Sequence, residues 1–435
     1  MEVKPGYKLT EVGVIPEDWS AEAIDSLGGS HAPAIKAGPF GSSLKKDSYV
    51  SIGFKVYGQE QVIRGDIFYG DYFIPIKKYN ELETCTVKSG DILLSLVGTV
   101  GKLLAVPENA PKGIINPRLI RFSFDHKKVD SCFFKNLFES TYIQALLDSS
   151  AQGGTMSILN ASMLRQIRLP LPPLPEQTAI ATTLSDVDAL ISSLDALISK
   201  KKQIKQGTMQ ELLSGKRRLP GFGGEWGVRR LGDVAVLHKE NVIPNATPDK
   251  TFTHFSLPSY DQGKEPVVEL GLSIGSNKFR VISGAVLISK LNPRIPRIWV
   301  PLIIPEDSVA STEFLVLTPK ECITRNYLYV LLTSPRLQEQ MELAATGTTG
   351  SHQRIGPEHV LKLVLHVPNA ISEQQAIATI LSDMDAEITT LEARRDKTKL
   401  LKQGMMQELL TGRIRLPMEH STVSVKIKPA LETRQ

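Results

Sequence analysis

Side chains suited to phosphate and base recognition occur together in one short segment near the start of the chain. The segment AGPFGSSLKK, residues 37–46, places two glycines, two serines and two lysines around a single phenylalanine. Glycine lets a backbone approach a ligand closely, and lysine and serine side chains bond phosphate oxygens. This composition indicates a nucleic-acid-binding loop, although an ordinary surface turn has the same composition.

Further polar side chains lie where short apolar runs are interrupted, and their amide, hydroxyl and guanidinium groups are of types that bond base edges and phosphates. The residues interpreted as DNA-binding are Phe40, Ser42, Ser43, Lys45, Lys46, Gln59, Gln61, Arg64, Thr99, Lys102, Asn116, Arg118, Gly153, Thr155, Arg294, Arg297 and Arg354. Gly153 and Thr155 belong to a glycine-rich turn that recurs as TGTTG at residues 346–350. Taken alone, each of these residues fits an ordinary surface position better than a DNA contact.

The chain lacks the motifs on which several large enzyme classes depend. It has no Asn-Pro-Pro-aromatic loop of the amino-methyltransferase type, no glycine-rich cofactor loop between a strand and a helix, and no GxxxxGK[ST] phosphate loop. None of the 8 histidines pairs with a serine or cysteine in a recognisable nucleophile arrangement. The sequence therefore predicts a protein that binds and does not catalyse.

Composition sets broad limits on the partners and the compartment. The 435 residues include 51 Lys and Arg against 46 Asp and Glu, and the net charge of +5 is weak evidence for an anionic partner. The 3 cysteines are far apart and lack metal-ligand spacing, so we expect neither a disulfide framework nor a metal site. This cysteine usage fits a reducing, cytoplasmic location. Because no apolar run approaches the roughly 18 residues of a membrane span, we expect no membrane contact.

One stretch of the chain occurs twice. Residues 176–220 and 373–417 are identical at 28 of 45 positions without a gap, with a constant offset of 197 residues. Such self-similarity indicates two copies of one unit rather than several unrelated domains.

Each copy has the pattern of a long amphipathic helix. Apolar residues recur at alternating spacings of four and three, which keeps them on one helix face and is typical of a coiled-coil surface. The predicted seam consists of Ile180, Leu184, Val187, Ile191, Leu194 and Ile198 in the first copy and of Ile377, Leu381, Met384, Ile388 and Leu391 in the second. The two seams are expected to bury each other, although each helix could instead pack on its neighbouring domain.

Residue types at the ends of the repeat fit helix boundaries. Pro175 precedes the first copy, and Ser372 with Gln375 predicts a capping box in the second. Gly215 and Gly412 stand where C-terminal glycine caps belong. A helix over residues 176–213 would be ~57 Å long at ~1.5 Å per residue.

The segments between the helices predict two mixed domains. Short β-branched and aromatic runs between residues 54 and 124, FKVYGQEQVI among them, predict strands of a mixed or antiparallel sheet, and RLPLPPLPEQ predicts a stiff hinge into the first helix. The second domain repeats the pattern, because SGAVLISK at residues 283–290 parallels SGDILLSL at residues 89–96. Trp19 and Trp226, each ahead of a Leu-Gly pair, are expected to anchor the cores.

Taken together, these segments resemble the specificity subunits of type I restriction-modification systems. The resemblance rests on GYKLTEVGVIPEDW, AGPFGSSLKKDSY, PLPPLPEQTAIATTLSDVDALI and KQGTMQELLSGKRRLPGF, and on the second copies of the last two. It implies an α+β fold with two target-recognition domains, residues 1–172 and 216–370. Two spacer helices, residues 173–215 and 371–413, would be packed as an antiparallel coiled coil, and residues 414–435 would form a tail.

The same resemblance implies what the chain does and with which partners. Each domain would recognise one half of a bipartite, asymmetric site in double-stranded DNA. Two modification subunits that carry S-adenosylmethionine would methylate adenine, and restriction subunits would use ATP and Mg to translocate DNA. The chain itself would hold no cofactor. The residues also leave open a coiled-coil scaffold that does not bind DNA, and a stand-alone methyltransferase with an unrecognised cofactor site.

Overall fold

The computed structural model describes residues 3–29, 33–96, 99–150, 160–347 and 353–417. The chain divides into two compact units, unit 1 with Met1–Ser193 and Arg395–Gln435, and unit 2 with Leu194–Arg394. Each unit therefore combines one globular domain with one half of each of the two long helices.

The domain of unit 1 is built on two four-stranded sheets. The first sheet has the order β4 (Ile35–Ala37), β11 (Leu119–Phe122), β8 (Ile92–Ser95) and β9 (Leu103–Ala105), and the second has the order β6 (Phe73–Ile74), β5 (Phe54–Tyr57), β10 (Gly113–Ile115) and β7 (Thr86–Val87). The remaining strands form the pairs β1 (Tyr7–Thr10) with β2 (Gly13–Pro16) and β3 (Ser20–Ala23) with β12 (Arg168–Leu171). The helices are α1 (Gln59–Arg64), α2 (Ile76–Glu81), α3 (Ser131–Phe138), α4 (Thr141–Ser150) and α5 (Ala161–Gln166).

The domain of unit 2 is built in the same way. Its first sheet has the order β14 (Ala235–His238), β22 (Phe314–Pro319), β19 (Val286–Ser289) and β20 (Ile298–Trp299). Its second sheet has the order β15 (Asn241–Val242), β18 (Lys278–Arg280), β21 (Ser308–Ser311), β16 (Thr251–Phe255) and β17 (Val267–Leu270). β13 (Trp226–Arg230) pairs with β23 (Val364–Pro368), and the helices are α7 (Leu231–Val234), α8 (Leu257–Asp261), α9 (Arg325–Leu332), α10 (Pro335–Leu343) and α11 (Pro357–Leu361).

The two domains share one topology, although their sequences have diverged. The order β4-β11-β8-β9 corresponds to β14-β22-β19-β20, and β6-β5-β10-β7 corresponds to β17-β16-β21-β18 with β15 added at the edge. Each second sheet contains one parallel pair, β5 with β10 and β16 with β21, among antiparallel neighbours. The prediction of two mixed domains built from one repeated unit is confirmed.

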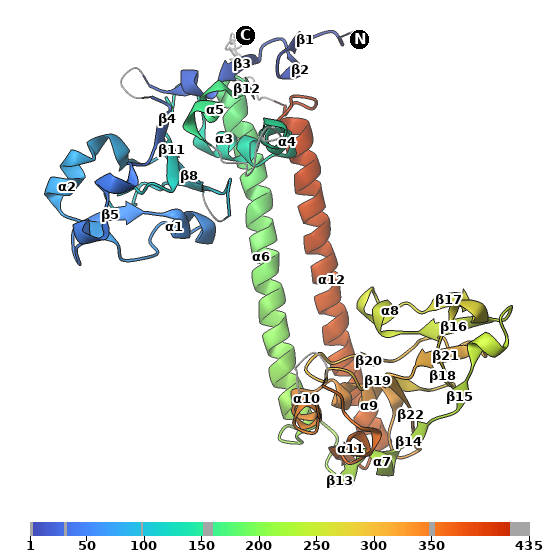
Figure 1. Ribbon diagram of the computed structural model, residues 1–435. Helices are drawn as coiled ribbons and strands as arrows, with labels where there is room; N and C mark the ends of the chain where they lie inside the picture. The colour runs from blue at the N-terminus through green and yellow to red at the C-terminus, as the bar shows by residue number, and fades with distance from the viewer. Residues whose placement is uncertain (1–2, 30–32, 97–98, 151–159, 348–352, 418–435) are drawn as a thin grey trace, which may run out of the picture. The chain divides into compact units, whose positions relative to one another are not determined.

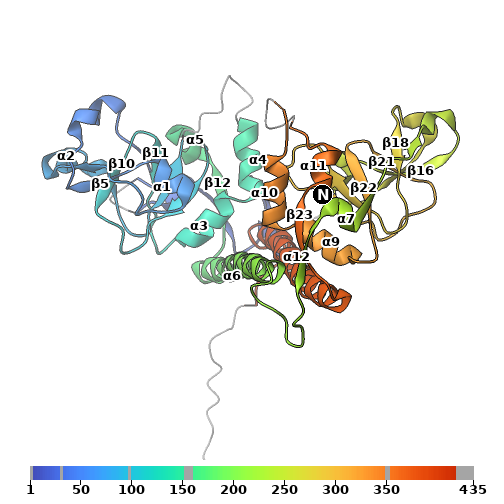
Figure 2. The ribbon, with the colours of Figure 1, turned by 90° about the horizontal axis from the view of Figure 1, so that it is seen from below.

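The long helices are α6 (Leu174–Leu213) and α12 (Ile371–Leu409), and within each unit the half of one lies beside the half of the other (Figures 1 and 2). In unit 1, Lys402 Nζ lies 2.7 Å from Asp188 Oδ2, and in unit 2, Lys205 Nζ lies 2.5 Å from Asp385 Oδ1. The two pairs are one contact repeated at the 197-residue offset. Unit 2 also pairs Lys202 with Glu392, and unit 1 also pairs Glu176 with Arg415. Within each unit, residue numbers thus rise along α6 as they fall along α12 and the segment that follows it, so the halves run antiparallel.

The predicted apolar seam contacts more than the other helix. Its first turns, Ile180 and Leu184 in α6, join the main core of unit 1 with Trp19 and Phe133, and Leu409 of α12 joins the same core. In unit 2 the equivalent residues Ile377 and Leu381 join the core that contains Tyr327 and Met209. Leu194, Ile198 and Ile388 are buried as well, and Val187, Ile191, Met384 and Leu391 are half-buried. The first turns of each seam therefore pack into a domain core, and the burial of the remaining seam residues against the other helix stays a prediction.

Several local expectations need correction. Residues 59–64, predicted within a strand, form helix α1, because Gly58 N donates to Gln61 Oε1 at 2.8 Å and so caps the first turn. α12 begins at Ile371, so Ser372 lies inside its first turn and does not cap it. The proline-rich segment, predicted as a hinge, begins as strand β12, and α6 starts three residues after that strand ends. Pro170 is tolerated in β12 because this strand pairs with β3 alone.

Two of the predicted end signals do occur. Gly215 has φ +71° and Gly412 has φ +70°, the left-handed conformation typical of a glycine that ends a helix. Their amides donate to Leu212 O and Leu409 O, respectively, at 3.3 Å.

Candidate nucleic-acid interface

Three loops of unit 1 leave the first sheet at the same end. Ala37, the last residue of β4, pairs with Ile120, and Ser95, the last residue of β8, pairs with Leu119, the first residue of β11. Gly38 N then donates to Leu119 O at 2.9 Å, and Leu96 N donates to Arg118 O at 3.0 Å. We call the residues that follow these strand ends the unit 1 loop edge: residues 38–46, 99–102 and 116–118.

The loop at residues 38–46 is held against its neighbour by close packing. A Cβ atom at Gly38 would lie 1.9 Å from the Asn116 carbonyl oxygen, so no other residue fits this approach. Downstream, Ser43 N donates to Phe40 O at 2.8 Å within a short 3-10 turn, and Leu44 is buried. The loop therefore has a fixed conformation, from which Phe40, Ser42, Lys45 and Lys46 project into solvent.

One buried hydroxyl group orders the second loop. Ser95 Oγ donates to Thr99 O at 2.6 Å and accepts from Lys102 N at 3.1 Å, so the strand end fixes the turn that follows it. Thr99 and Lys102 are exposed on this turn.

The third loop and the start of α1 complete the edge. Asn116 Oδ1 accepts from Arg118 N at 2.9 Å, and Asn116 N donates to Tyr57 O at 2.9 Å, which places the end of β5 beside this loop. Gln59 begins α1 two residues after Tyr57 and is half-buried, whereas Arg118 is exposed. The structure thus brings together Phe40, Ser42, Ser43, Lys45, Lys46, Gln59, Thr99, Lys102, Asn116 and Arg118.

Other candidate residues of unit 1 lie in different environments. Gln61 is fully buried and its Nε2 donates to Tyr69 O at 2.7 Å, so it supports the fold and offers no group to a ligand. The Arg64 guanidinium, at the end of α1, lies 4.0 Å from the centroid of the Tyr69 ring. Gly153 and Thr155 lie outside the described residues.

Unit 2 carries its three predicted arginines at the corresponding sheet end. β19 ends at Ser289, whose amide donates to Arg297 O at 2.9 Å, so residues 290–297 form a closed loop. Lys290 N donates to Glu313 O at 2.8 Å, and Arg354 pairs with both Leu291 and Thr346. We call residues 290–297, 312–313 and 353–354 the unit 2 loop edge.

Two of these arginines form ion pairs with carboxylates. Arg297 binds Asp261 of α8 through two hydrogen bonds of 2.7 and 2.9 Å, and the guanidinium holds the pKa of Asp261 below its ordinary value. The Arg354 guanidinium lies 3.2 Å from Glu313 Oε1. Arg294 is exposed on the loop between them. The free positive charge at this edge therefore comes mainly from Arg294, whereas Arg297 and Arg354 also fix the loop geometry.

Sequence reasoning missed one basic residue of this edge and a buried carboxylate anchor at the start of each long helix. Lys290 could have been found, because SGAVLISK aligns with SGDILLSL and places Lys290 beside the start of the unit 1 turn. The anchors are buried carboxylates: Glu176 accepts from Arg415 and from Trp19 Nε1, and Glu373 accepts from Arg218. The repeat contained that signal, since Glu176 and Arg218 recur as Glu373 and Arg415.

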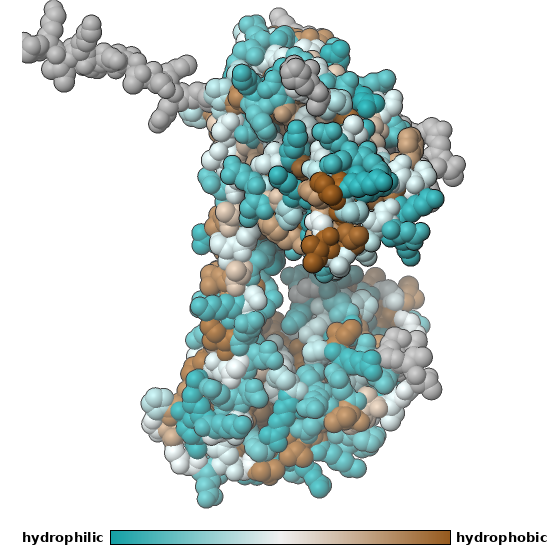
Figure 3. All heavy atoms as spheres, turned by 90° about the vertical axis from the view of Figure 1, so that its left-hand side faces the viewer, coloured by the Kyte–Doolittle hydropathy of each residue, from teal (hydrophilic) through white to brown (hydrophobic). Residues whose placement is uncertain are grey.

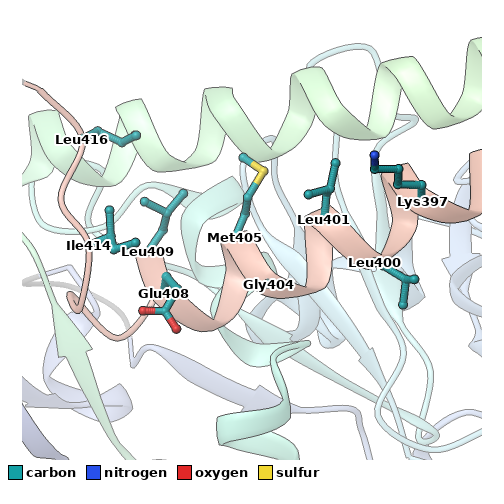
Figure 4. A pocket seen from close by; sticks show the side chains of 9 residues that line it. All are labelled: Lys397, Leu400, Leu401, Gly404, Met405, Glu408, Leu409, Ile414 and Leu416. Carbon is teal, nitrogen blue, oxygen red and sulfur yellow. The ribbon is translucent and has the colours of Figure 1, made fainter. Parts of the chain in front are cut away.

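A second surface feature is an apolar groove on the last turns of α12. It has a volume of about 490 Å³ and is lined by Lys397, Leu400, Leu401, Gly404, Met405, Glu408, Leu409, Ile414 and Leu416 (Figure 4). Leu400, Leu401 and Ile414 are more than half exposed. The equivalents of Leu400, Met405 and Ile414 in the first copy of the repeat are Gln203, Thr208 and Arg217, so this surface is more apolar in the second copy.

Two other site classes are not found in the described part of the chain. No group of three or more His, Cys, Asp or Glu side chains there is arranged to hold a metal ion. No helix in the described ranges is long and apolar enough to cross a membrane.

Comparisons with known proteins assign the fold to a family. The model of the type I restriction modification DNA specificity domain matches residues 41–206 and 223–401. The type I restriction enzyme MjaVIII specificity subunit of Methanocaldococcus jannaschii is 29% identical over 218 residues, and the match covers 49% of this chain and 49% of that protein. The MjaX specificity subunit of the same organism is 23% identical over 447 residues, covering 94% of this chain and 97% of that protein.

Solved structures agree on the fold. The type I restriction-modification system S subunit from M. genitalium aligns with a TM-score of 0.55 at 14% identity, covering 94% of this chain and 98% of that chain. A chain from a structural study of type I R-M complex assembly aligns with a TM-score of 0.54 at 17% identity, covering 92% of this chain and 99% of that chain. The chain belongs to the family of type I restriction-modification specificity subunits, and the resemblance noted in its sequence is confirmed.

Proposed function

We propose that this chain is the sequence-specific DNA-binding subunit of a type I restriction-modification complex. In this proposal the two loop edges bind the two halves of a bipartite DNA site, and partner subunits carry out adenine methylation and restriction. One observation carries the proposal: the same end of the same sheet presents cations and hydrogen-bonding side chains in both units, yet the two sets differ.

The side chains of the unit 1 loop edge suit both kinds of DNA contact. Lys45, Lys46 and Lys102 are exposed cations that can neutralise phosphates, and Arg118 can form paired hydrogen bonds with guanine. The Arg118 amide donates to Asn116 Oδ1, which fixes the backbone at Arg118 before DNA arrives. A preorganised loop loses little conformational entropy on binding, which favours affinity.

The unit 2 loop edge supports recognition of a different half-site. It offers Lys290 and Arg294 on a loop whose other arginines are held by Asp261 and Glu313. The segment GPFGSSLKK has no counterpart there, because β14 ends at His238 and the next strand begins at Asn241. Because base readout depends on which groups the loops present, we infer that the target is not a palindrome.

The partner subunits are proposed on the family relationship and on the surface of the helix ends. We propose two modification subunits, which supply S-adenosylmethionine, and restriction subunits, which supply ATP and Mg chemistry, while this chain is not catalytic. The apolar groove with exposed Leu400 and Ile414 would be covered by a modification subunit. In this scheme α6 and α12 serve as the spacer between the recognition domains.

Methylome sequencing tests the proposed function. DNA from a methylation-free host that expresses the chain with its modification partner is expected to contain modified adenine in a split, asymmetric motif. A complex that assembles by gel filtration but modifies no DNA would contradict the proposal and favour the scaffold alternative.

The salt dependence of DNA binding, measured without any methylation assay, also distinguishes a DNA-binding subunit from a scaffold. DNA binding through several phosphates weakens steeply with salt, by a slope of about 0.9 per phosphate contact in a logarithmic plot. Lys45→Ala is expected to lower that slope by about one contact. A scaffold that does not bind DNA would show no such dependence.

A further inference from the structure

The most exposed aromatic side chain in the described part of the chain stands on the first loop of the unit 1 loop edge, residues 38–46. Phe40 is 87% exposed, whereas the next aromatic residue, Tyr72, is 56% exposed. Hydrophilic side chains cover most of the face of this domain that Figure 3 shows, with apolar surface confined to small areas. A phenylalanine so exposed contributes nothing to the core and keeps its full hydrophobic cost in water.

Contacts on both sides of Phe40 fix the backbone of its loop. Pro39, which precedes it, is buried and has a restricted backbone, and the Gly38 contact with Asn116 fixes the segment one residue earlier. On the other side, the hydrogen bond from Ser43 N to Phe40 O and the buried Leu44 close the turn. These contacts fix the backbone from which the ring projects into solvent.

The neighbours of Phe40 are the groups that would hold a DNA backbone. Ser42, Lys45 and Lys46 follow it on the same loop, and Arg118 stands on the adjacent loop. If these groups bind phosphates, an apolar ring between them would face the base stack of the bound duplex. Proteins that insert Phe, Leu, Ile or Met between base pairs unstack one step and bend the duplex.

We propose that Phe40 is a wedge that inserts between two base pairs of the half-site bound by unit 1. The inference rests on the proposed function and adds a specificity mechanism, because the cost of unstacking depends on the base step. A flexible pyrimidine-purine step at the insertion point is therefore preferred, without any hydrogen bond to its base edges.

The test uses the assembled complex and a duplex that carries the mapped site, with 2-aminopurine replacing one base at a time outside the target adenine. Fluorescence of 2-aminopurine rises where a base is unstacked. We expect a rise at one step of the unit 1 half-site with the unaltered chain, and its loss with Phe40→Ala. Affinity is expected to fall about 10- to 100-fold with an unchanged salt slope, as for loss of one stacked base.

Two variants keep the result interpretable. Phe40→Leu retains an apolar wedge and is expected to keep part of the fluorescence rise. Ile52→Ala removes an apolar side chain that is 86% exposed in the segment before β5, at the opposite end of that strand from Asn116, and should leave affinity and fluorescence unchanged. Because Phe40 lies outside every core cluster, Phe40→Ala should also unfold at the same temperature as the unaltered chain.

The outcomes separate the wedge from the proposed function. If Phe40→Ala methylates its site, binds it with unaltered affinity and gives the same fluorescence profile, the wedge is overturned while the DNA-binding function stands. If the unaltered complex neither binds nor methylates a specific site, both inferences are overturned.

Discussion

The two units of this chain have the same fold, and each has a buried glutamate at the start of a long helix that is paired with an arginine. They differ in whether a tryptophan also bonds that glutamate. In unit 1, Trp19 is 1% exposed and its Nε1 donates to Glu176 at 3.0 Å. In unit 2, Trp226 is half-buried and its Nε1 has no hydrogen-bond partner among the described residues. The buried carboxylate and its arginine recur in both units, whereas the tryptophan contact does not. The residues at the helix ends therefore make the same ion pair in both units, whereas the tryptophan ahead of each domain makes its hydrogen bond to that pair in unit 1 alone, among the described residues.

The largest expected effect separates the two tryptophans. Trp19→Ala removes a fully buried indole and should destabilise unit 1 by about 3–5 kcal/mol, whereas Trp226→Ala should cost unit 2 about 1–2 kcal/mol because its ring is already partly solvated. Hydrogen exchange followed by mass spectrometry reports the two units separately. Equal losses in both units would contradict this account of the anchors.

For the two arginines that pair with the buried glutamates, we expect the opposite order: the larger loss of stability on substitution in unit 2. Arg218→Ala leaves Glu373, whose side chain is 2% exposed, without a donor among the described side chains, so we expect a loss of about 3 kcal/mol in unit 2. After Arg415→Ala, Glu176 still accepts from Trp19, and the expected loss in unit 1 is about 2 kcal/mol. Combining Arg415→Ala with Trp19→Phe should remove the difference, and urea unfolding monitored by exchange would show whether it does.

Acid should weaken unit 2 before unit 1. Burial lowers the pKa of His254, and burial beside Arg336 lowers that of His366, both in unit 2. Above pH ~6.5 these histidines are neutral in both states. As the pH falls below that value the unfolded chain takes up protons that the folded unit does not, so stability declines until the folded pKa is reached. Hydrogen exchange between pH 7.5 and 5.5, corrected for the intrinsic exchange rates, measures the stability of each unit across this range. His254→Gln together with His366→Gln should abolish the difference, and persistence of the decline in that variant would rule out these histidines as its source.

The smallest expected effect concerns the ion pairs between the long helices. Lys402 with Asp188 in unit 1 and Lys205 with Asp385 in unit 2 are partly exposed, so each pair should contribute about 0.2–1 kcal/mol and less at high salt. Double-mutant cycles to alanine measure each coupling energy. A coupling well above 1 kcal/mol would mean that these pairs, and not the apolar seam, determine how the halves of the helices pair.

The long helices and the duplication could be predicted from sequence because each depends on local spacing. The alternation of Ile180, Leu184 and Leu194 defines a helix face whatever its partner, and the 197-residue offset is visible without a structure. The sequence could not show that Ile180 and Leu184 pack into the domain core, because that partner is assembled from residues distant in the chain.

The same distinction between local pattern and distant contacts applies to the residues predicted to bind DNA. Phe40, Lys102 and Arg118 were proposed one by one, and the pairing of β4, β11 and β8 brings them to one edge. Gln61 has the same residue type as a base-reading side chain but is buried, because the amide that suits adenine also suits the backbone of Gly58 and Tyr69. Residue type alone does not distinguish these uses, and the topology does.

The most direct test of the central claim, that each unit recognises its own half-site, is the methylome of a symmetrised chain. Residues 226–370 would be replaced by residues 19–173, so that both domains carry the unit 1 loop edge while the helix ends keep their repeat-equivalent anchors. We predict that the modification complex with the unaltered chain modifies an asymmetric split motif, and that the complex with the symmetrised chain modifies a palindromic motif built from one of its halves. Retention of the original asymmetric motif by the symmetrised chain would contradict the claim.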